Sequence, residues 1–307
     1  MTAQSEAMAL PVTTRKQRTL WGDVWVQFRK HKLAMFGLVV IVLIVVSVMI
    51  GPMIYTRDPE YIDFSVANQA PSLQYPFGTD NLGRDGLSRN LHGGRISIAV
   101  GVVAMLISMF VGSLIGALSG YYSKLDGPLM RFTDMMLALP LLPLLLVIIL
   151  LFRDTLRATF GPETGIFLLI VFVIGILNWM PTARVVRGSV LSVKEKEFIE
   201  AAISIGTNEN TVLLKHVFPN VLSPIIVAAT LSIANAIITE SALSFLGLGF
   251  PSDVPTWGRL LYDGKDFMTF TPWVVIFPGL FISFTVLGIN FMGDGLRDAL
   301  DPKLKRS

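Results

Sequence analysis

The run Val39-Val40-Ile41-Val42-Leu43-Ile44-Val45-Val46 decides the fold class of this chain. It carries no polar side chain, whereas a strand of a membrane barrel alternates apolar and polar residues. The run lies inside a charge-free stretch, residues 33–56, and about 20 apolar residues in a helix cross a hydrocarbon core of about 30 Å. We therefore expect a transmembrane α-helix here and an all-α membrane protein.

Five further charge-free runs of comparable length follow the first one. They are residues 96–123, 135–152, 164–183, 216–239 and 267–293. In the whole chain, 52% of the 307 residues are hydrophobic and only 15% are charged, which is outside the range of soluble domains. The mean hydropathy of +0.63 agrees with this. We expect six transmembrane helices.

Basic residues set the expected orientation, because lysine and arginine accumulate on cytoplasmic loops. With the N-terminus inside, inner segments hold 17 of the 25: Arg15, Lys16, Arg18, Arg29, Lys30, Lys32, Lys124, Arg131, Arg184, Arg187, Lys194, Lys196, Lys215, Arg297, Lys303, Lys305 and Arg306. Both termini are therefore expected in the cytoplasm. The expected division is a basic cytoplasmic segment 1–32, a first transmembrane anchor 33–56, an external loop 57–95, a five-helix transmembrane core 96–297 with a cytoplasmic loop 184–218, and a cytoplasmic tail 298–307.

Several chemistries are absent from the sequence. There is no cysteine, and the three histidines, His31, His92 and His216, are far apart, so we expect no metal site. No phosphate-binding loop, nucleophile elbow or zinc-protease motif occurs, so we expect no catalytic residue and no cofactor bound by this chain. The net charge of +3 suits anionic membrane lipid rather than nucleic acid. We therefore interpret the chain as a transport protein, and any energy for transport is expected to come from a partner.

The external loop contains the run Phe77-Gly78-Thr79-Asp80-Asn81-Leu82-Gly83-Arg84-Asp85. Asp80 and Asp85 are able to accept hydrogen bonds from local backbone or from Arg84, while Gly78 and Gly83 permit turns. Two interpretations remain open. Asp80, Arg84 and Asp85 either form a self-bonded turn or contact a partner outside the membrane.

Small and polar residues stand out within the spans. Gly112, Gly116 and Gly120 leave one helix face without side chains, which favours close helix packing. Pro140 and Pro143 each remove a helix hydrogen bond, so we expect a kink near the pathway or a packing kink. Ionisable and amide side chains inside a membrane are functional candidates, and the candidates for the translocation path are Glu240, Asn178, Asn235 and Asn290. The alternative for Glu240 is a buried structural pair.

A polar island interrupts the hydrophobic runs between residues 184 and 215. The segment 194–205 has good helix formers and an expected apolar side made of Phe198, Ile199, Ala202, Ile203 and Ile205. Gly206 is suited to end this helix in a left-handed conformation, and Thr207 or Asn208 to cap the next one. Pro219 fits the first turn of the fifth span. Taken alone, the island is either a docking device or an interfacial helix on lipid.

The spacing within the island resembles the cytoplasmic signature of ABC importer membrane subunits. Glu200, Ala201, Ala202, Gly206 and Pro219 match that signature, while His216 and Phe218 stand where isoleucine and leucine are commoner. In that family the loop docks into a groove on the ATP-binding subunit and transmits its closure to the spans. The resemblance therefore implies a set of ATPase-coupling residues: Glu200, Ala201, Ala202, Ile203, Gly206, His216 and Pro219.

The resemblance covers nearly the whole chain and points to the C-type membrane subunit of dipeptide and oligopeptide importers. It is carried by the basic segment 28–32, the run 77–85 and the ending Gly293-Asp294-Gly295-Leu296-Arg297-Asp298-Ala299-Leu300-Asp301-Pro302. We expect the acidic residues and Arg297 of this ending to form a local ion-paired cap, which is also able to contact the ATPases. The resemblance implies the type I ABC importer permease fold in the bacterial inner membrane.

The same resemblance implies partners and cargo. The partners are a homologous B-type membrane subunit, two ATPases that bind ATP and magnesium, and an extracytoplasmic solute-binding protein. Di- or oligopeptides are the expected cargo, with nickel chelates or glutathione as alternatives. A self-sufficient secondary carrier would show inverted repeats, and an intramembrane enzyme would show a nucleophile with its base. Neither feature is visible in the sequence.

Overall fold

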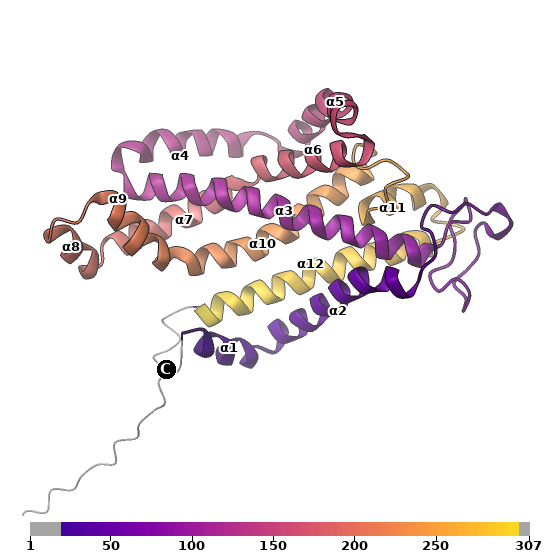
Figure 1. The fold of residues 1–307 in the computed structure, drawn as a ribbon, viewed down its shortest axis with the longest axis horizontal. Helices are drawn as coiled ribbons and strands as arrows, with labels where there is room; N and C mark the ends of the chain where they lie inside the picture. Colours follow the sequence, from indigo (N-terminus) through magenta and orange to yellow (C-terminus); the bar gives the residue numbers. More distant parts are fainter. Residues whose placement is uncertain (1–19, 301–307) are drawn as a thin grey trace, which may run out of the picture.

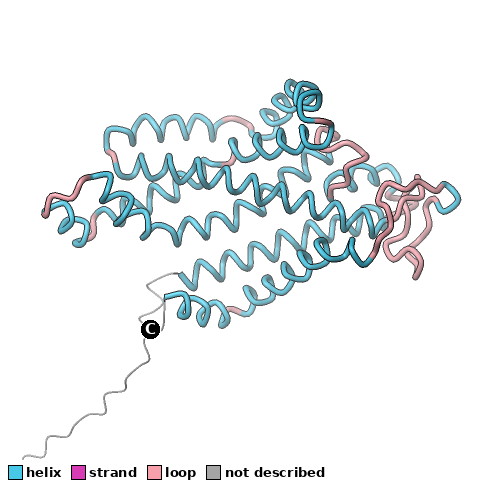
Figure 2. Tube along the Cα trace, in the orientation of Figure 1, coloured by secondary structure: helices cyan, strands magenta, loops and turns pink. Residues whose placement is uncertain are grey.

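The computed structural model describes residues 20–300, and this part of the chain is built from helices without a β-strand (Figures 1 and 2). The basic residues expected before Leu20 and the residues after Leu300 lie outside the described part. The α-helices are α1 (Leu20–Lys30), α2 (Lys32–Ile54), α3 (Gly86–Tyr121), α4 (Ser123–Ala138), α5 (Leu141–Phe160), α6 (Pro162–Leu177), α7 (Trp179–Lys194), α8 (Glu197–Ser204), α9 (Glu209–Thr211), α10 (Phe218–Phe245), α11 (Trp257–Gly264) and α12 (Trp273–Leu300).

Five helical stretches are long and apolar enough to cross a membrane: Lys32–Ile54, Gly86–Tyr121, Pro162–Lys194, Glu209–Phe245 and Trp273–Leu300. The helices α4 and α5 pass the same test as a pair but meet at an angle of 84°. The six expected spans are therefore present if this bent pair counts as one. Large hydrophobic side chains remain exposed along these helices, as is expected of helices that face lipid.

The bend between α4 and α5 has a local cause. Pro140 disfavours a helical conformation of the residue before it, and Leu139 has an extended ψ of 136°. Pro143 lies in the first turn of α5, where its missing N–H is one that the helix leaves unpaired anyway. The kink expected from the two prolines is confirmed, and Pro140 is the residue that produces it.

The glycine face of α3 packs against α7. A Cβ atom at Gly112 would lie 2.7 Å from the Thr182 Cβ, and one at Gly116 would lie 2.5 Å from the Ala183 carbonyl oxygen. Both distances are below van der Waals contact, so only glycine permits this approach of the two backbones. The packing role expected from the four-residue spacing is confirmed.

The fourth span is longer than its charge-free run. It continues through Arg184 and Arg187 as far as Lys194, because Val186, Val190 and Val193 bury against α3 and the island. Arg187 is paired with Asp126 of α4 at 2.5 Å. The polar island therefore projects from the bundle after Lys194 rather than after residue 183.

The two ends of the bundle carry different structures. The loop between α2 and α3 and the helix α11 lie at one end, whereas α8 and α9 lie at the other (Figure 1). The described start of α1 and the described end of α12 lie at the same end as α8 and α9. This arrangement separates the polar island from the long loop by the whole length of the helices.

Candidate functional site

The polar island folds as a short helix followed by a sharp bend. The helix α8 begins at Glu197, because Lys196 is extended and separates it from α7. Gly206 has φ of +84°, and the Thr207 N–H donates to the Ala202 carbonyl at 3.1 Å. The Asn208 side chain caps the next helix by accepting from the Asn210 N–H at 3.1 Å. The left-handed glycine and the following cap are as expected from the sequence.

The apolar residues of α8 divide into two faces, which corrects the single apolar side expected from the sequence. Ile199 and Ala202 are buried against Val190 of α7 and Val212 of the following segment. Ile203 and Ile205 point away from this cluster and are exposed, as are Phe198, Glu200 and Ala201. The buried face fixes α8 to the bundle, and the exposed face is left for another surface.

The path from the island into the fifth span is continuous. A π-helical segment, Val212–Val217, joins α9 to α10, and the Phe218 N–H donates to the Leu213 carbonyl. Pro219 lies in the first turn of α10 as expected, but the helical path already begins at Glu209. The wider π turn accommodates the missing donor of Pro219 without a break. His216 is half-buried in this segment.

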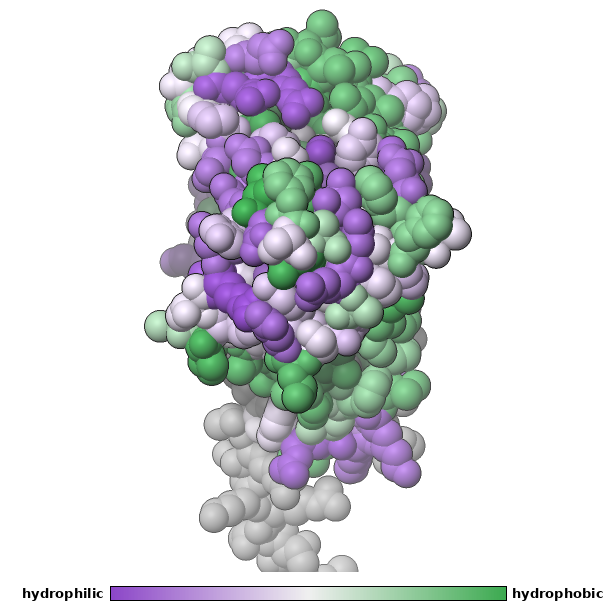
Figure 3. All heavy atoms as spheres, turned by 90° about the vertical axis from the view of Figure 1, so that its right-hand side faces the viewer, coloured by the Kyte–Doolittle hydropathy of each residue, from purple (hydrophilic) through white to green (hydrophobic). Residues whose placement is uncertain are grey.

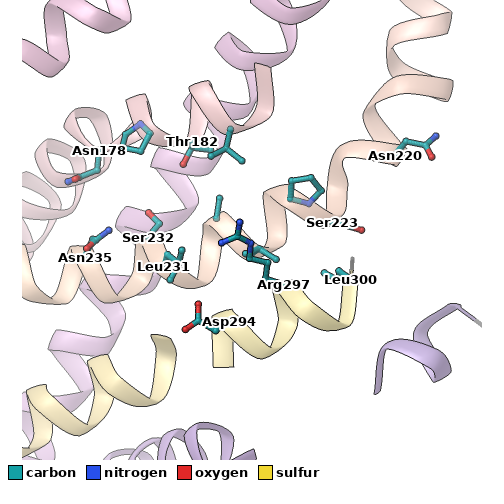
Figure 4. Close-up of a pocket in the computed structure, with 15 residues that line it drawn as sticks. Asn178, Thr182, Asn220, Ser223, Leu231, Ser232, Asn235, Asp294, Arg297 and Leu300 are labelled. Atoms are coloured by element: carbon teal, nitrogen blue, oxygen red, sulfur yellow. The ribbon is translucent and has the colours of Figure 1, made fainter. Parts of the chain in front are cut away.

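A cavity of about 660 Å³ opens between α7, α10 and the C-terminal end of α12 (Figure 4). Asn178 and Asn235 line it together with Thr182, Ser223 and Ser232. The two asparagines were predicted from the sequence, but the hydroxyl residues were not. A helical pattern could have revealed Ser223, because residues at steps of three and four lie on one helix face. The residues in this pattern are Asn220, Ser223, Val227, Leu231 and Asn235.

Asn178 also marks a break in the fourth span. It separates α6 from α7, and its backbone carbonyl accepts from the Ser108 hydroxyl at 2.8 Å. Its side-chain amide donates to the Ile174 carbonyl at 2.8 Å. A polar group at a helix break that lines a cavity is the arrangement that membrane helices tolerate.

Glu240 lies outside the cavity and is completely buried. Its carboxylate accepts from Ser244 at 2.7 Å, Thr256 at 2.9 Å and Ser97 at 3.3 Å. Thr256 is the N-cap of α11, so Glu240 ties that helix to α3 and α10. This geometry favours the structural alternative for Glu240. Asn290 is half-buried and is not among the residues that line the cavity.

The C-terminal end of α12 carries Asp294, Arg297 and Asp298, for which the sequence predicted an ion-paired cap. Asp294 and Arg297 line the cavity, and within residues 20–300 neither has an ion-pair partner within 4.0 Å (Figure 4). Asp298 instead lies 3.6 Å from His31, the residue that caps α2. Among the described residues, Asp294, Arg297 and Asp298 therefore form no ion pair with one another. Asp301 lies outside the described residues.

The run 77–85, which precedes α3, forms an internally bonded turn. Asp80, Arg84 and Asp85 are only 4%, 7% and 5% exposed. Asp80 accepts from Arg84 at 2.7 Å and from Arg89 at 2.9 Å, and Asp85 caps α3 by accepting from the Ser88 N–H in its first turn. Arg89 also pairs with Asp263 of α11 at 3.2 Å. The three side chains are occupied within the chain, which favours the self-bonded turn over contact with a partner.

The comparisons with known proteins agree with this architecture. Residues 89–306 match the family described as binding-protein-dependent transport system inner membrane component. The chain belongs to this family. Residues 19–71 also match the N-terminal transmembrane domain of oligopeptide transport permease C. This member of the family is a multi-pass permease of the bacterial inner membrane, and its expected family and localisation are confirmed.

Curated relatives of this permease cover almost its whole length. It is 39% identical to the oligopeptide transport system permease protein OppC of Bacillus subtilis over 95% of this chain and 93% of that protein. It is 40% identical to OppC of Haemophilus influenzae over 93% and 89%. It is also 40% identical to the glutathione transport system permease protein GsiD of Escherichia coli O157:H7 over 98% and 97%.

A solved chain of the MetNI methionine ABC transporter has a similar fold. The TM-score is 0.54 at 17% sequence identity, and the match covers 68% of this permease and 95% of that chain. At this identity the likeness shows the fold alone. It confirms the expected type I ABC importer permease fold.

Proposed function

We propose that this permease forms half of the translocation pathway of an ATP-driven importer of di- and oligopeptides. One observation carries the proposal: the continuous helix Glu209–Phe245 begins just after the bend at Gly206 and lines the polar cavity between Asn220 and Asn235. A force on α8 therefore acts directly on a wall of the pathway. The partners are a homologous B-type membrane subunit, two ATPases that bind ATP and magnesium, and an extracytoplasmic binding protein.

The exposed face of α8 is the proposed contact with an ATPase. Phe198, Ile203 and Ile205 are hydrophobic side chains exposed at the tip of the bundle, beyond the helices that face lipid. Glu200 lies beside them and is suited to pair with a basic residue in the groove of the partner. The orientation that places this tip in the cytoplasm also places both termini there, in agreement with the distribution of lysine and arginine.

The proposed mechanism is alternating access. Closure of the two ATPases on ATP draws the α8 helices of the two membrane subunits together and opens the cavity outward, and hydrolysis resets it inward. This requires that α8 binds one state of the ATPase better than the other, because equal binding shifts no population. The sequence also allowed α8 to lie on the lipid surface. In that case α8 would not distinguish the two states of the ATPase.

The cavity lining supports a peptide cargo. Asn178, Asn235 and Ser232 offer donors and acceptors that match the backbone amides of a peptide, whatever its side chains are. Permeases named for oligopeptide transport are close relatives, and the N-terminal match names the same function. Glutathione is the second candidate, because a permease named for its transport is as similar in sequence.

Transport by the reconstituted complex tests the proposal. The four subunits are assembled in liposomes with each candidate binding protein, and uptake of radiolabelled trialanine and of glutathione is measured with and without ATP. ATP-dependent trialanine uptake is expected. Uptake of glutathione alone would assign the second cargo. Trialanine uptake without the ATPases would contradict the proposal and indicate a secondary carrier.

A further inference from the structure

The external loop presents hydrophobic side chains to water. Tyr61 and Phe64 are 66% and 70% exposed, and Ile62 and Leu73 are exposed as well. We call these four residues the outer rim. The loop that carries them lies at the end of the bundle, beyond the last residue of α2, so lipid tails do not explain their exposure (Figure 1). The view onto this end shows hydrophobic residues exposed among hydrophilic ones (Figure 3). Several exposed hydrophobic side chains on a loop outside the spans are typical of a protein contact.

The outer rim is held in a defined position. The Asp63 N–H donates to the Leu82 carbonyl at 3.2 Å, and the Asn68 N–H donates to the Asp80 carbonyl at 2.9 Å. Gly83 has φ of +75°, and a Cβ atom there would lie 1.8 Å from the Asp63 carbonyl oxygen. The loop is therefore bonded onto the buried turn below it. A loop whose backbone is fixed before binding loses little conformational freedom when a partner arrives.

An acidic notch of about 280 Å³ lies next to the outer rim. Asp58, Asp63 and the rings of Tyr61 and Tyr75 line it. The Arg57 guanidinium lies 4.4 Å from the centre of the Tyr75 ring and pairs with Asp85 at 3.3 Å, so its charge is already balanced. Hydrogen bonds from Ser65 hold the pKa of Asp63 below its usual value, which keeps this carboxylate ionised at neutral pH.

We propose that the outer rim and the acidic notch are the seat of the extracytoplasmic binding protein, and that a lysine or arginine of that protein enters the notch. This inference rests on the proposed function. Carboxylates and tyrosine rings together attract a basic side chain, and the rim supplies hydrophobic anchors around it. Exposed Asp58 and Glu60 repel anionic lipid headgroups, so charge favours a basic protein surface over the membrane.

Photocrosslinking in the assembled transporter tests which partner covers the rim. The photoreactive residue p-benzoylphenylalanine replaces Phe64, or Phe160 as a control, an exposed aromatic residue at the end of α5. Purified binding proteins of the source organism are added to the complex in lipid nanodiscs. A crosslink from position 64 to a binding protein that also stimulates the ATPase is expected, without one from position 160. Crosslinks from position 64 only to lipid or to another membrane subunit would overturn the proposal.

A variant series tests the contribution of the rim to binding. For Tyr61→Ser/Phe64→Ser we expect the binding-protein concentration that half-stimulates the ATPase to rise tenfold or more. Basal ATPase activity and subunit assembly should stay unchanged, and Phe160→Ser should remain within about twofold of wild type. For Asp58→Lys/Glu60→Lys we expect weaker stimulation at low salt.

The outcomes separate this proposal from the function on which it rests. Suppose that the wild-type complex imports trialanine, but the Tyr61→Ser/Phe64→Ser variant needs no more binding protein than wild type for half-maximal ATPase stimulation. This result would reject the outer rim as the docking site and leave the proposed function unaffected. A wild-type complex that no binding protein stimulates, and that imports no peptide, overturns both.

Discussion

The Nε atom of Arg95 donates a hydrogen bond of 2.7 Å to the backbone carbonyl of Val48, the carbonyl that Pro52 leaves without a helical donor. A second bond from the same guanidinium reaches the Met49 carbonyl at 2.6 Å. A proline in a membrane helix is tolerated when a neighbour satisfies the freed carbonyl, and here α3 supplies that donor to α2. The helix α2 is thereby bonded to α3 near the C-terminal end of α2.

Replacing Arg95 by methionine should destabilise the junction of α2 and α3. The Val48 carbonyl then has no protein donor, which is expected to lower the unfolding free energy by about 1–3 kcal/mol. Thermal unfolding of the purified chain in detergent measures this. Arg95→Lys, which retains one donor, should lose less stability. Equal stability of wild type and Arg95→Met would refute the role assigned to this bond.

Gly116→Val should disrupt the packing of α3 on α7. The added Cβ would lie 2.5 Å from the Ala183 carbonyl, so the two helices must separate, at an expected cost of about 1–3 kcal/mol. Gly127 of α4 has open space around its Cβ position, which makes Gly127→Val the matched control. Yield and thermal stability of the two variants in detergent are compared. The prediction fails if they behave alike.

Gly206→Val should uncouple ATP hydrolysis from uptake. No atom lies within 4 Å of a Cβ at this position, so the effect comes from the left-handed backbone alone and is about 1–2 kcal/mol. Gly206→Asn should retain activity, because asparagine tolerates this conformation. Gly188→Val, at a site with equal space and ordinary φ, is the control. The amount of peptide taken up per ATP hydrolysed is measured for each variant. A wild-type ratio in Gly206→Val would exclude this coupling role.

Glu240→Leu should lower stability more than Glu240→Gln. Leucine leaves the hydroxyls of Ser244 and Thr256 without their buried acceptor, with an expected loss of about 2 kcal/mol or more, whereas the amide oxygen of glutamine still accepts. The peptide KM of Glu240→Gln should equal that of wild type, since Glu240 does not line the cavity. A raised KM with unchanged thermal stability would instead indicate contact with cargo.

Asn235→Leu should raise the peptide KM severalfold and leave stability near that of wild type. Asn235 is exposed to the cavity, so the change removes hydrogen-bonding groups from the proposed path without opening a buried space. Ile238, exposed one helical turn away and outside the cavity lining, provides the control Ile238→Ala. Trialanine uptake in liposomes distinguishes the two. An unaffected KM in Asn235→Leu would remove Asn235 from the path.

Local sequence rules predicted the features that depend on a few neighbouring residues. The apolar run 39–46 predicted a membrane helix, and Gly206 predicted the left-handed stop between α8 and α9, because both follow from single-residue backbone and transfer preferences. The four-residue spacing of Gly112, Gly116 and Gly120 predicted a packing face, because residues four apart lie on the same face of a helix. The continuation of the fourth span to Lys194 was not predictable, since Arg187 is accommodated there only by Asp126 of another helix.

The sequence by itself determined that this chain is a helical membrane protein whose spans are interrupted by a polar island, because hydrophobic length and a glycine stop are local properties of the chain. Only the tertiary structure decided which polar residues share the cavity. Asn178, Asn235, Asp294 and Arg297 come from distant segments and meet there, whereas Glu240 and Asp80 bury their charge against partners that no spacing rule connects. Whether a carboxylate faces a cavity or a buried hydrogen-bond donor depends on how each helix is rotated about its axis and which helices pack against it.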